Sequence, residues 1–252
     1  MSPGGAKRRQ SVGLPVGCGT QTRLAGNRVT VVNRERVLQA DLFADESKAG
    51  RWPIAPGAVV LHGFALPEEN ALLADITPLL AAAPFRQLVT PGGYVMSVAM
   101  SNCGQLGWVS DLKGYRYAAL DPQTNQPWPA MPPIFLQLAR RAAAVAGFAG
   151  FEPDACLINC YQPGARLSLH QDRNERDFDA PIVSVSLGLP ATFLFGGLQR
   201  SDRSQRISLQ HGDVVVWGGP ARLRYHGVLA LKPGNHPLLG AQRINLTFRK
   251  AG

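Results

Sequence analysis

The sequence predicts a mainly β protein of jelly-roll type, in which two antiparallel sheets fold over one another and two helices flank them. Eight short strand patterns follow Asp154, separated by Gly and Pro turns. Two helical patterns precede these strands. The length of 252 residues suits one β-rich domain, and 45% hydrophobic against 17% charged residues is typical of a globular chain. We therefore expect one domain with a sizeable core.

The first 40 residues differ from the rest in composition. They are rich in Gly, Ser and Arg and show little periodicity. Residues 1–36 carry six of the nine net positive charges of the chain. We expect a basic disordered arm over 1–40, although an overlong start to the reading frame fits the same pattern. Because this segment inflates the net charge, the charge gives only weak support for a polyanionic partner such as nucleic acid.

Neither a membrane span nor a secretion signal is evident in the sequence. No apolar run approaches the roughly 18 residues that a membrane helix needs. The N-terminus lacks the apolar core of a signal peptide, and the four cysteines show no Cys-x-x-Cys spacing. We expect a soluble, monomeric protein of the cytoplasm, with reduced thiols and no membrane partner.

One strand and two helices are predicted ahead of the β-rich region. Residues 41–56 show no regular pattern and are expected to be irregular, whereas 58–64 form a short apolar strand. Pro67 begins a helix with Glu68 and Glu69 in its first turn, where acidic residues suit the helix dipole. A second helix spans 134–147 and ends at Gly147. The residues expected to face the core are Leu72, Leu73, Ile76, Leu80, Phe135, Leu138, Ala142 and Val145.

Between the helices, residues 90–133 combine glycines with aromatic side chains. Tyr94, Trp108, Tyr115, Tyr117 and Trp128 occur there, with short strands at most between turns. Such a segment is either a flexible cover or a binding lid, because aromatics on irregular backbone offer stacking faces that a core would hide. We interpret it as a lid.

The predicted jelly-roll core covers about 155–250. Its strands span 155–162, 166–172, 182–189, 192–195, 206–209, 213–217, 225–231 and 243–249. Eight short strands with tight turns favour two sheets folded over each other, with the helices against the outside of one sheet.

The strand 166–172 carries the first chemical signal. His170 and Asp172 share one face of this strand with Arg166 and Ser168, because side chains alternate with period two. An Fe(II) ion that must also bind a cosubstrate and dioxygen is typically held by two histidines and one carboxylate. His226 is the best candidate for the second histidine. A His-x-Asp pair alone also fits a surface strand with two polar residues.

Another His-x-Asp pair competes with this assignment. His211 and Asp213 are separated by Gly212, which indicates a turn into the following Val-Val-Val strand rather than a flat strand face. We expect this pair to be structural, and we expect His62 and His236 to have no special role.

The last strand carries the second signal. Arg243, Asn245, Thr247 and Arg249 share one face, and Asn159 and Tyr161 alternate in the same way on an earlier strand. If helices cover the outside of the sheet, these polar faces turn inward. Buried arginines need anionic partners, and a dicarboxylate can be gripped bidentately by a guanidinium. The alternative is an outward-facing polar surface.

These residues together carry a resemblance to a known family. The segments concerned are His170-Gln-Asp172, Pro181-Ile-Val-Ser-Val-Ser-Leu-Gly-Leu, Phe195-Gly-Gly-Leu, His211-Gly-Asp-Val-Val-Val-Trp-Gly-Gly, Arg224-Tyr-His-Gly, Arg243-Ile-Asn-Leu-Thr-Phe-Arg, Thr90-Pro-Gly-Gly-Tyr and Asn102-Cys-Gly. They resemble the bacterial AlkB family of Fe(II)- and 2-oxoglutarate-dependent nucleic-acid demethylases. The resemblance covers 41–252 and leaves the basic arm outside.

The resemblance implies a fold, a ligand set and a reaction. The fold would be a double-stranded β-helix with an N-terminal nucleotide-recognition lid at about 90–133. The reaction would be direct-reversal repair of bases such as 1-methyladenine and 3-methylcytosine in single- or double-stranded DNA, or in RNA. It would consume 2-oxoglutarate and O2 and release succinate, CO2 and formaldehyde.

Each residue role below follows from the resemblance. Fe(II) would be held by His170, Asp172 and His226. The residues around 2-oxoglutarate would be Asn159, Tyr161, Arg243, Asn245 and Arg249, the last counted as catalytic with the metal ligands. Trp108 would stack on the damaged base opposite His170, and Tyr115, Tyr117 and Arg200 would line the nucleotide site.

One position departs from the family pattern, which places an acidic residue two positions after the metal-binding aspartate. Here that residue is Asn174. An amide donates and accepts hydrogen bonds, whereas an ionised carboxylate only accepts, so we place Asn174 at the substrate and leave the base preference open.

Two other functions are compatible with parts of the sequence. A 2-oxoglutarate-dependent hydroxylase that acts on protein would keep the metal ligands and arginines but should lack the aromatic lid. A non-catalytic nucleic-acid-binding module would need basic surface but no inward group of metal ligands.

Overall fold

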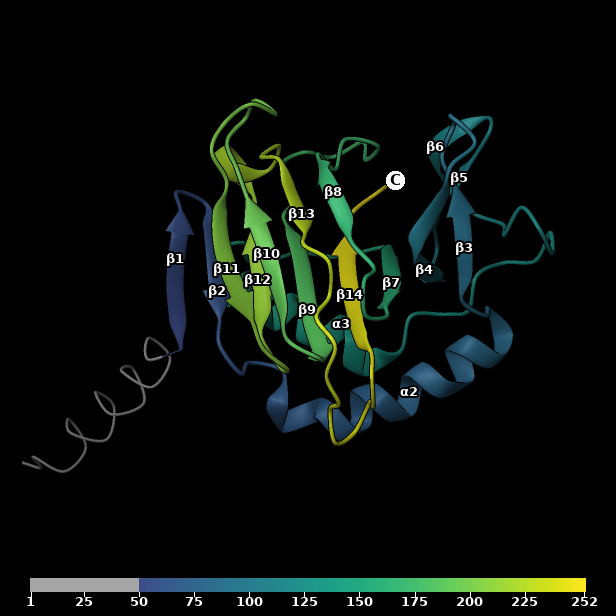
Figure 1. Ribbon diagram of the computed structural model, residues 1–252, viewed down its shortest axis with the longest axis horizontal. Coiled ribbons are helices and arrows are strands. Elements are labelled where there is room, and N and C mark those ends of the chain that lie inside the picture. Colours follow the sequence, from purple (N-terminus) through teal and green to yellow (C-terminus); the bar gives the residue numbers. More distant parts are fainter. Residues whose placement is uncertain (1–49) are drawn as a thin grey trace, which may run out of the picture. The chain divides into compact units, whose positions relative to one another are not determined.

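The computed structural model describes residues 50–252, in which two sheets face each other across a cavity. The larger sheet has eight strands in the order β1-β2-β12-β9-β14-β7-β4-β3, and the smaller has four in the order β11-β10-β13-β8 (Figure 1). Neighbouring strands in both sheets pair antiparallel. The jelly-roll prediction is thereby confirmed, whereas the predicted arm at 1–40 lies outside the described residues.

The strands have the following bounds. Those of the larger sheet are β1 Arg51–Ala55, β2 Ala58–Leu61, β3 Arg86–Val89, β4 Val95–Gly104, β7 Ala155–Tyr161, β9 Ile182–Gly188, β12 Val214–Trp217 and β14 Arg243–Arg249. Those of the smaller sheet are β8 Leu167–His170, β10 Ala191–Phe195, β11 Gln205–Leu209 and β13 His226–Val228. A separate hairpin consists of β5 Gly107–Asp111 and β6 Gly114–Ala118.

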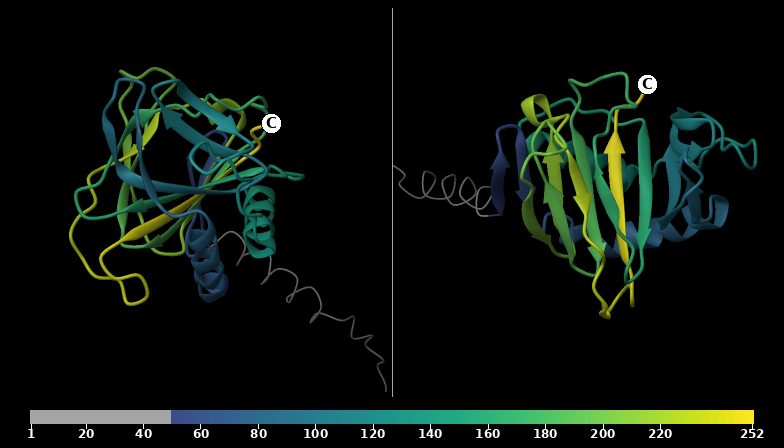
Figure 2. Two further views of the ribbon diagram at one scale, coloured as in Figure 1. Left: turned by 90° about the vertical axis from the view of Figure 1, so that its right-hand side faces the viewer. Right: turned by 45° about the horizontal axis from the view of Figure 1, so that its top comes forward.

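Two helices cover the outer face of the larger sheet, as predicted. They are α2, Glu69–Ala82, which follows the 3-10 turn Leu66–Glu68, and α3, Pro133–Val145 (Figure 2). Leu72 and Leu138 on these helices belong to the same buried cluster as Val185, Leu246 and Phe248 of the sheet. A second 3-10 turn spans Gly219–Ala221. Among residues 50–252, no helix is long and apolar enough to cross a membrane.

Alternation along the strands separates this outer core from a second, inner core. On β14, Ile244, Leu246 and Phe248 pack toward the helices, while Arg243 and Asn245 point to the space between the sheets. The inner core contains Tyr161, Phe193, Phe195 and Trp217, which pack between the two sheets. The outward-facing alternative for the polar face of the last strand is therefore wrong.

Two predictions about the residues before the jelly-roll core are wrong. Residues 51–55 were expected to be irregular, but they form β1 and pair antiparallel with β2. Pro53 is tolerated there because β1 lies at the edge of the sheet, where, among residues 50–252, one side of the strand has no ladder partner to lose. Val145 was expected to face the core, but it is exposed at the end of α3.

The segment 90–133 is more regular than predicted. Its first part forms β4, a ten-residue strand that pairs with β7 inside the larger sheet. Trp128 is buried, and its indole Nε1 donates to the carbonyl of Ala118 at 2.9 Å, so it supports the β5–β6 hairpin instead of offering a stacking face. The β5–β6 hairpin lies beside β3 and β4 at the end of the larger sheet (Figure 1).

Candidate active site

A cavity of about 890 Å³ lies between the two sheets. Its walls come from the inner faces of β7 and β14 on one side and of β8 and β13 on the other, and the β5–β6 hairpin contributes Trp108 and Tyr115. It brings together almost all of the site residues predicted from the sequence. These are Trp108, Tyr115, Asn159, Tyr161, His170, Asp172, Asn174, Arg200, His226, Arg243, Asn245 and Arg249.

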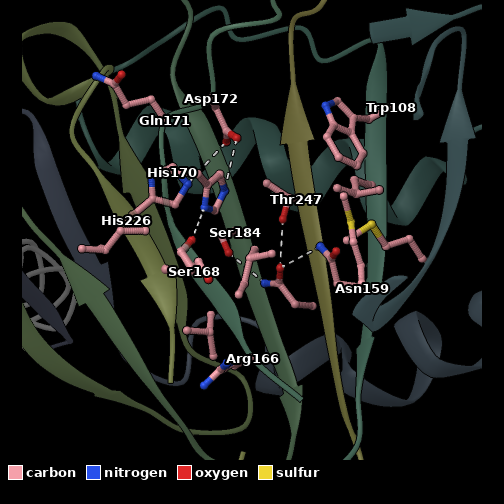
Figure 3. Close-up of a pocket in the computed structure, with 18 of the residues that line it drawn as sticks. Trp108, Asn159, Arg166, Ser168, His170, Gln171, Asp172, Ser184, His226 and Thr247 are labelled. Carbon is pink, nitrogen blue, oxygen red and sulfur yellow. Dashed lines mark hydrogen bonds and ion pairs between the residues drawn. The ribbon is translucent and has the colours of Figure 1, made fainter. Parts of the chain in front are cut away.

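Three potential metal ligands converge in this cavity (Figure 3). One ligand atom each from His170, Asp172 and His226 lies within 4.8 Å of the others, and within residues 50–252 no other histidine, cysteine or acidic residues form such a group. The two histidines are register partners on β8 and β13. Their Nε2 atoms lie 3.7 and 3.6 Å from the Asp172 carboxylate oxygens.

Backbone contacts orient both imidazole rings toward a shared point. The Nδ1 atom of His170 lies 2.8 Å from the Ser168 carbonyl, and that of His226 lies 3.0 Å from the Arg224 carbonyl. A carbonyl only accepts, so each Nδ1 carries the proton and each Nε2 keeps its lone pair for a metal. Burial, followed by the neighbouring His226, lowers the pKa of His170 to about 4, which keeps the ring neutral near pH 7.

Arg249 forms a buried ion pair with the Asp172 carboxylate. It donates from Nε and Nη2 to Asp172 Oδ2 at 3.0 and 2.8 Å, and its side chain is buried. Burial by itself would raise the pKa of Asp172, but the Arg249 guanidinium and His226 hold that pKa well below its ordinary value. The resemblance had placed Arg249 beside the cosubstrate, and the structure adds this ion pair with the potential metal ligand.

Arg243 also lines the cavity, and within residues 50–252 no acidic side chain pairs with it. Its Nη2 donates to Ser186 Oγ at 2.9 Å, and its guanidinium lies 5.0 Å from the centre of the Tyr161 ring. Within residues 50–252, its Nε and Nη1 atoms are buried with no hydrogen-bond partner, as is Oδ1 of Asn159. A buried cation with unsatisfied donors is costly unless an anion joins it. The site therefore fits a small carboxylate ligand.

Serines on β9 complete this pocket, and the sequence analysis gave them no role. Ser184 Oγ accepts from Asn245 Nδ2 at 2.8 Å, and Ser186 Oγ accepts from Arg243. Asn245 Oδ1 in turn accepts from Thr247 and from Asn159. The signal was available, because Ser184 and Ser186 alternate with Val183 and Val185 on the strand.

The aromatic side of the cavity belongs to the hairpin. Trp108 and Tyr115 stack with ring centres 5.6 Å apart and planes 15° apart. The backbone of Trp108 is held by Asn102 of β4, whose side chain donates to the Trp108 carbonyl at 3.0 Å and accepts from its amide at 2.9 Å. The indole Nε1 of Trp108 donates to Asn174 Oδ1 at 3.5 Å. The stacked pair therefore lines the same cavity as the three potential metal ligands.

Tyr117 and the second His-x-Asp pair point elsewhere. Tyr117 lines a smaller neighbouring cavity, and its hydroxyl donates to Glu175 Oε1 at 2.6 Å. The sequence analysis missed Glu175.

His211 of the second His-x-Asp pair contacts Glu69 through Nε2 at 2.7 Å and accepts from the Gly188 amide at 2.8 Å, while Asp213 accepts from the Gly63 amide. His211 and Asp213 are therefore structural, as expected.

Comparison with known proteins agrees with this geometry. The model of the 2OG-Fe(II) oxygenase superfamily matches residues 57–249. The alpha-ketoglutarate-dependent dioxygenase AlkB of Salmonella typhimurium is 62% identical over 84% of this chain and 97% of its own length. The DNA N(6)-methyladenine demethylase ALKBH1D of Arabidopsis thaliana is 30% identical over 78% of this chain, which spans half of that protein.

A solved structure shares the fold. That of OsALKBH1 superposes with a TM-score of 0.69 at 27% identity, covering 79% of this chain and 99% of the other. The donor set of the cavity also suits the cofactors of the family, because it combines three potential metal ligands with a buried arginine that has two unpaired donors among residues 50–252. The chain therefore belongs to the AlkB family of Fe(II)- and 2-oxoglutarate-dependent dioxygenases.

Proposed function

We propose that this protein removes alkyl groups from the ring nitrogens of damaged nucleic-acid bases by oxidation. The observation that carries the proposal is that the stacked pair Trp108 and Tyr115 opens into the same cavity as His170, Asp172 and His226. A flat base held against the indole would have its edge directed at the metal. Family members whose names describe demethylation of DNA support a nucleic-acid substrate.

In this proposal His170, Asp172 and His226 hold Fe(II), and Arg243 binds a carboxylate of 2-oxoglutarate with help from Asn159, Tyr161 and Asn245. When bound, Fe(II), 2-oxoglutarate and O2 supply the oxidation of an alkyl C–H bond, which yields succinate, CO2 and a hydroxyalkyl base. A hydroxymethyl group then leaves the ring nitrogen as formaldehyde. No protein base is needed for that last step, because an N-hydroxymethyl group breaks down without enzymatic help.

The protein residues would bind and orient the substrate. The damaged base must leave a duplex stack or arrive single-stranded, because its ring nitrogens are hidden by pairing. Stacking on Trp108 and Tyr115 would then compensate for lost base stacking. Tyr117 anchors the hairpin through its hydrogen bond to Glu175, and Arg200, which lines the cavity, would contact a phosphate of the substrate.

We extend the proposal to lesions of the 1-methyladenine and 3-methylcytosine type in DNA or RNA. The two other functions considered from the sequence are less well supported. A protein hydroxylase would not need the stacked pair, and a binding module would not need an inward group of metal ligands. The monomeric state and the cytoplasmic location stay predictions.

Formaldehyde release from a methylated oligonucleotide tests the proposal. With Fe(II), 2-oxoglutarate and O2 supplied, we expect formaldehyde and repaired base in equal amounts. Asp172→Ala should abolish both, because it removes the anionic metal ligand, while circular dichroism should stay unchanged. Glu152→Ala, an exposed acidic residue outside the cavity, is the matched control and should react normally. Turnover by the Asp172 variant within a few-fold of the unaltered protein would contradict the ligand assignment.

A further inference from the structure

Glu175 is a buried acid that contacts the β5–β6 hairpin through Tyr117, strand β14 through Arg249 and the turn after Gly219–Ala221 through Arg222. Only 6% of its surface is exposed, and it follows Asp172 by three residues. Its Oε1 accepts from the Tyr117 hydroxyl at 2.6 Å and lies 3.4 Å from Arg249 Nε, while its Oε2 accepts from Arg222 Nη2 at 3.1 Å. A buried carboxylate with so many partners is built into the site and is not a solvated surface charge.

The same two arginines hold Asp172. Arg249 donates twice to Asp172 Oδ2, and Arg222 Nη1 donates to the Asp172 backbone carbonyl at 2.8 Å. Asp172, Glu175, Arg222 and Arg249 therefore form one cluster in which two carboxylates balance two guanidiniums. The cluster is buried, because Arg222 is only 3% exposed and Arg249 only 6%. Partners of this kind fix the orientation of a metal ligand and are worth tenfold or more in metal affinity.

Tyr117 connects this cluster to the β5–β6 hairpin. Tyr117 of β6 is the register partner of Trp108 of β5, so the hydroxyl that reaches Glu175 comes from the position opposite the stacking tryptophan. Because Oε1 of Glu175 contacts both Tyr117 and Arg249, a shift of the hairpin changes the contact with the guanidinium that holds Asp172 Oδ2.

We propose that Glu175 is a positioning residue that couples the binding of a base at the hairpin to the placement of the metal ligand Asp172. A base stacked on the hairpin would hold Tyr117 in the contact with Glu175 that the structure shows, which would keep Arg249 and with it the Asp172 carboxylate in place. Iron would then be held best when a base is present. The part of this proposal that concerns the base rests on the proposed function, and the part that concerns the metal does not.

The metal part is tested without nucleic acid. Fe(II) is titrated under argon into the full chain in the presence of 2-oxoglutarate, and the affinity is compared between the unaltered protein and Glu175→Gln. We expect about tenfold weaker Fe(II) binding, because the variant leaves the cluster with one uncompensated positive charge. Glu152→Gln, an exposed partner of Arg140, is the matched control. Affinity of the Glu175 variant within twofold of the unaltered protein would overturn the proposal.

The coupling is tested with Tyr117→Phe, which removes one hydroxyl and keeps the ring. The Fe(II) affinity is measured with and without a methylated oligonucleotide, and the ratio is the coupling factor, which must be the same when oligonucleotide binding is measured with and without Fe(II). For the unaltered protein we expect a factor of about 5 or more. For Tyr117→Phe we expect a factor near one.

The possible failures can be told apart. If the unaltered protein demethylates the oligonucleotide but shows no coupling, or if Tyr117→Phe keeps the full factor, the coupling is wrong and the proposed function stands. If no methylated oligonucleotide binds or reacts, the proposed function fails and the coupling fails with it. Should Glu175→Gln not fold, Tyr117→Phe still decides, because the loss of one hydroxyl at the hairpin leaves the charged cluster complete.

Discussion

At the scale of single residues, Asn174 bears on which damaged bases the site accepts. The Trp108 indole can only donate, so the atom of Asn174 that faces it must be the amide oxygen. The amide nitrogen is then the group left to face a base. That arrangement suits a base with a carbonyl beside the alkylated nitrogen better than one with an exocyclic amine.

We therefore expect Asn174→Asp to improve the reaction with 1-methyladenine and 3-methylcytosine. A carboxylate accepts from the exocyclic nitrogen and offsets the positive charge of the methylated ring. The gain should be on the order of 1 kcal/mol, roughly fivefold in kcat/KM. The measurement is kcat/KM on both lesions and on 1-methylguanine, for which the change should be a loss. Asn235→Asp adds the same charge on an exposed loop outside the cavity and serves as control. Unchanged values and ratios would mean that Asn174 does not face the base.

Arg243 illustrates a residue that is kept for a ligand and not for the fold. Two of its donors are buried without partners in the described part of the chain, and burial lowers its pKa. Arg243→Met should leave the free energy of unfolding of the ligand-free protein unchanged or raised, because a buried ion is replaced by an apolar side chain. The same variant should lose the stabilisation by 2-oxoglutarate.

Thermal unfolding measures both effects. With Fe(II) present under argon and 2-oxoglutarate at a hundred times its dissociation constant, the unaltered protein should gain about 2.7 kcal/mol. Arg243→Met should show no gain at that concentration, whereas Arg206→Met, at an exposed position of β11, should respond like the unaltered protein. A full gain in the Arg243 variant would show that the cosubstrate binds elsewhere.

At the scale of elements, the β5–β6 hairpin depends on a close contact between Gly107 and Trp128. A Cβ atom at Gly107 would come within 2.3 Å of the Trp128 ring, so the ring or the hairpin would have to move. We expect Gly107→Ala to weaken oligonucleotide binding strongly and to leave the Fe(II) site intact, because the metal ligands lie on β8, β13 and the residues after β8. Equilibrium binding of a methylated oligonucleotide and of Fe(II) by the same variant separates the two effects.

Gly92→Ala provides the control for that experiment. Gly92 lies in the same segment, but a Cβ there would meet only ordinary contacts of 3.5 Å or more. Both affinities should therefore stay close to those of the unaltered protein. Equal losses in the two variants would mean that the segment tolerates no added methyl group, and that the Trp128 contact has no special role.

At the scale of the whole molecule, the features that follow from alternation along a strand could be predicted from the sequence. The features that follow from pairing between distant segments could not. The polar face of β14 and the His-x-Asp of β8 follow a period of two, so their inward direction could be inferred once helices were expected outside. The strand β1 was missed because Pro53 usually argues against a strand, and only its place at the sheet edge explains it.

Glu175 and Arg222 show the same limit within the site. They are 47 residues apart, and each lies in a loop whose sequence is typical of solvated turns. No local pattern reveals that the two side chains pair with each other next to Asp172. The two serines of β9 were visible in the pattern, but their partners on β14 follow only from the strand order.

The charge of the whole chain leads to the last prediction. Residues 1–36 hold six of the nine net positive charges, so the rest of the chain is only moderately basic. If these charges meet phosphates, each contact adds about 0.7 to 0.9 to the slope of log affinity against log salt. Deleting residues 1–40 should therefore flatten the salt dependence of oligonucleotide binding, while turnover at saturating substrate stays the same, because those cavity residues that belong to the described range 50–252 all lie after residue 89. Deleting residues 1–6, which carry no charged side chain, is the control and should leave the slope unchanged. The same slope for all three proteins would show that the basic segment does not contact nucleic acid.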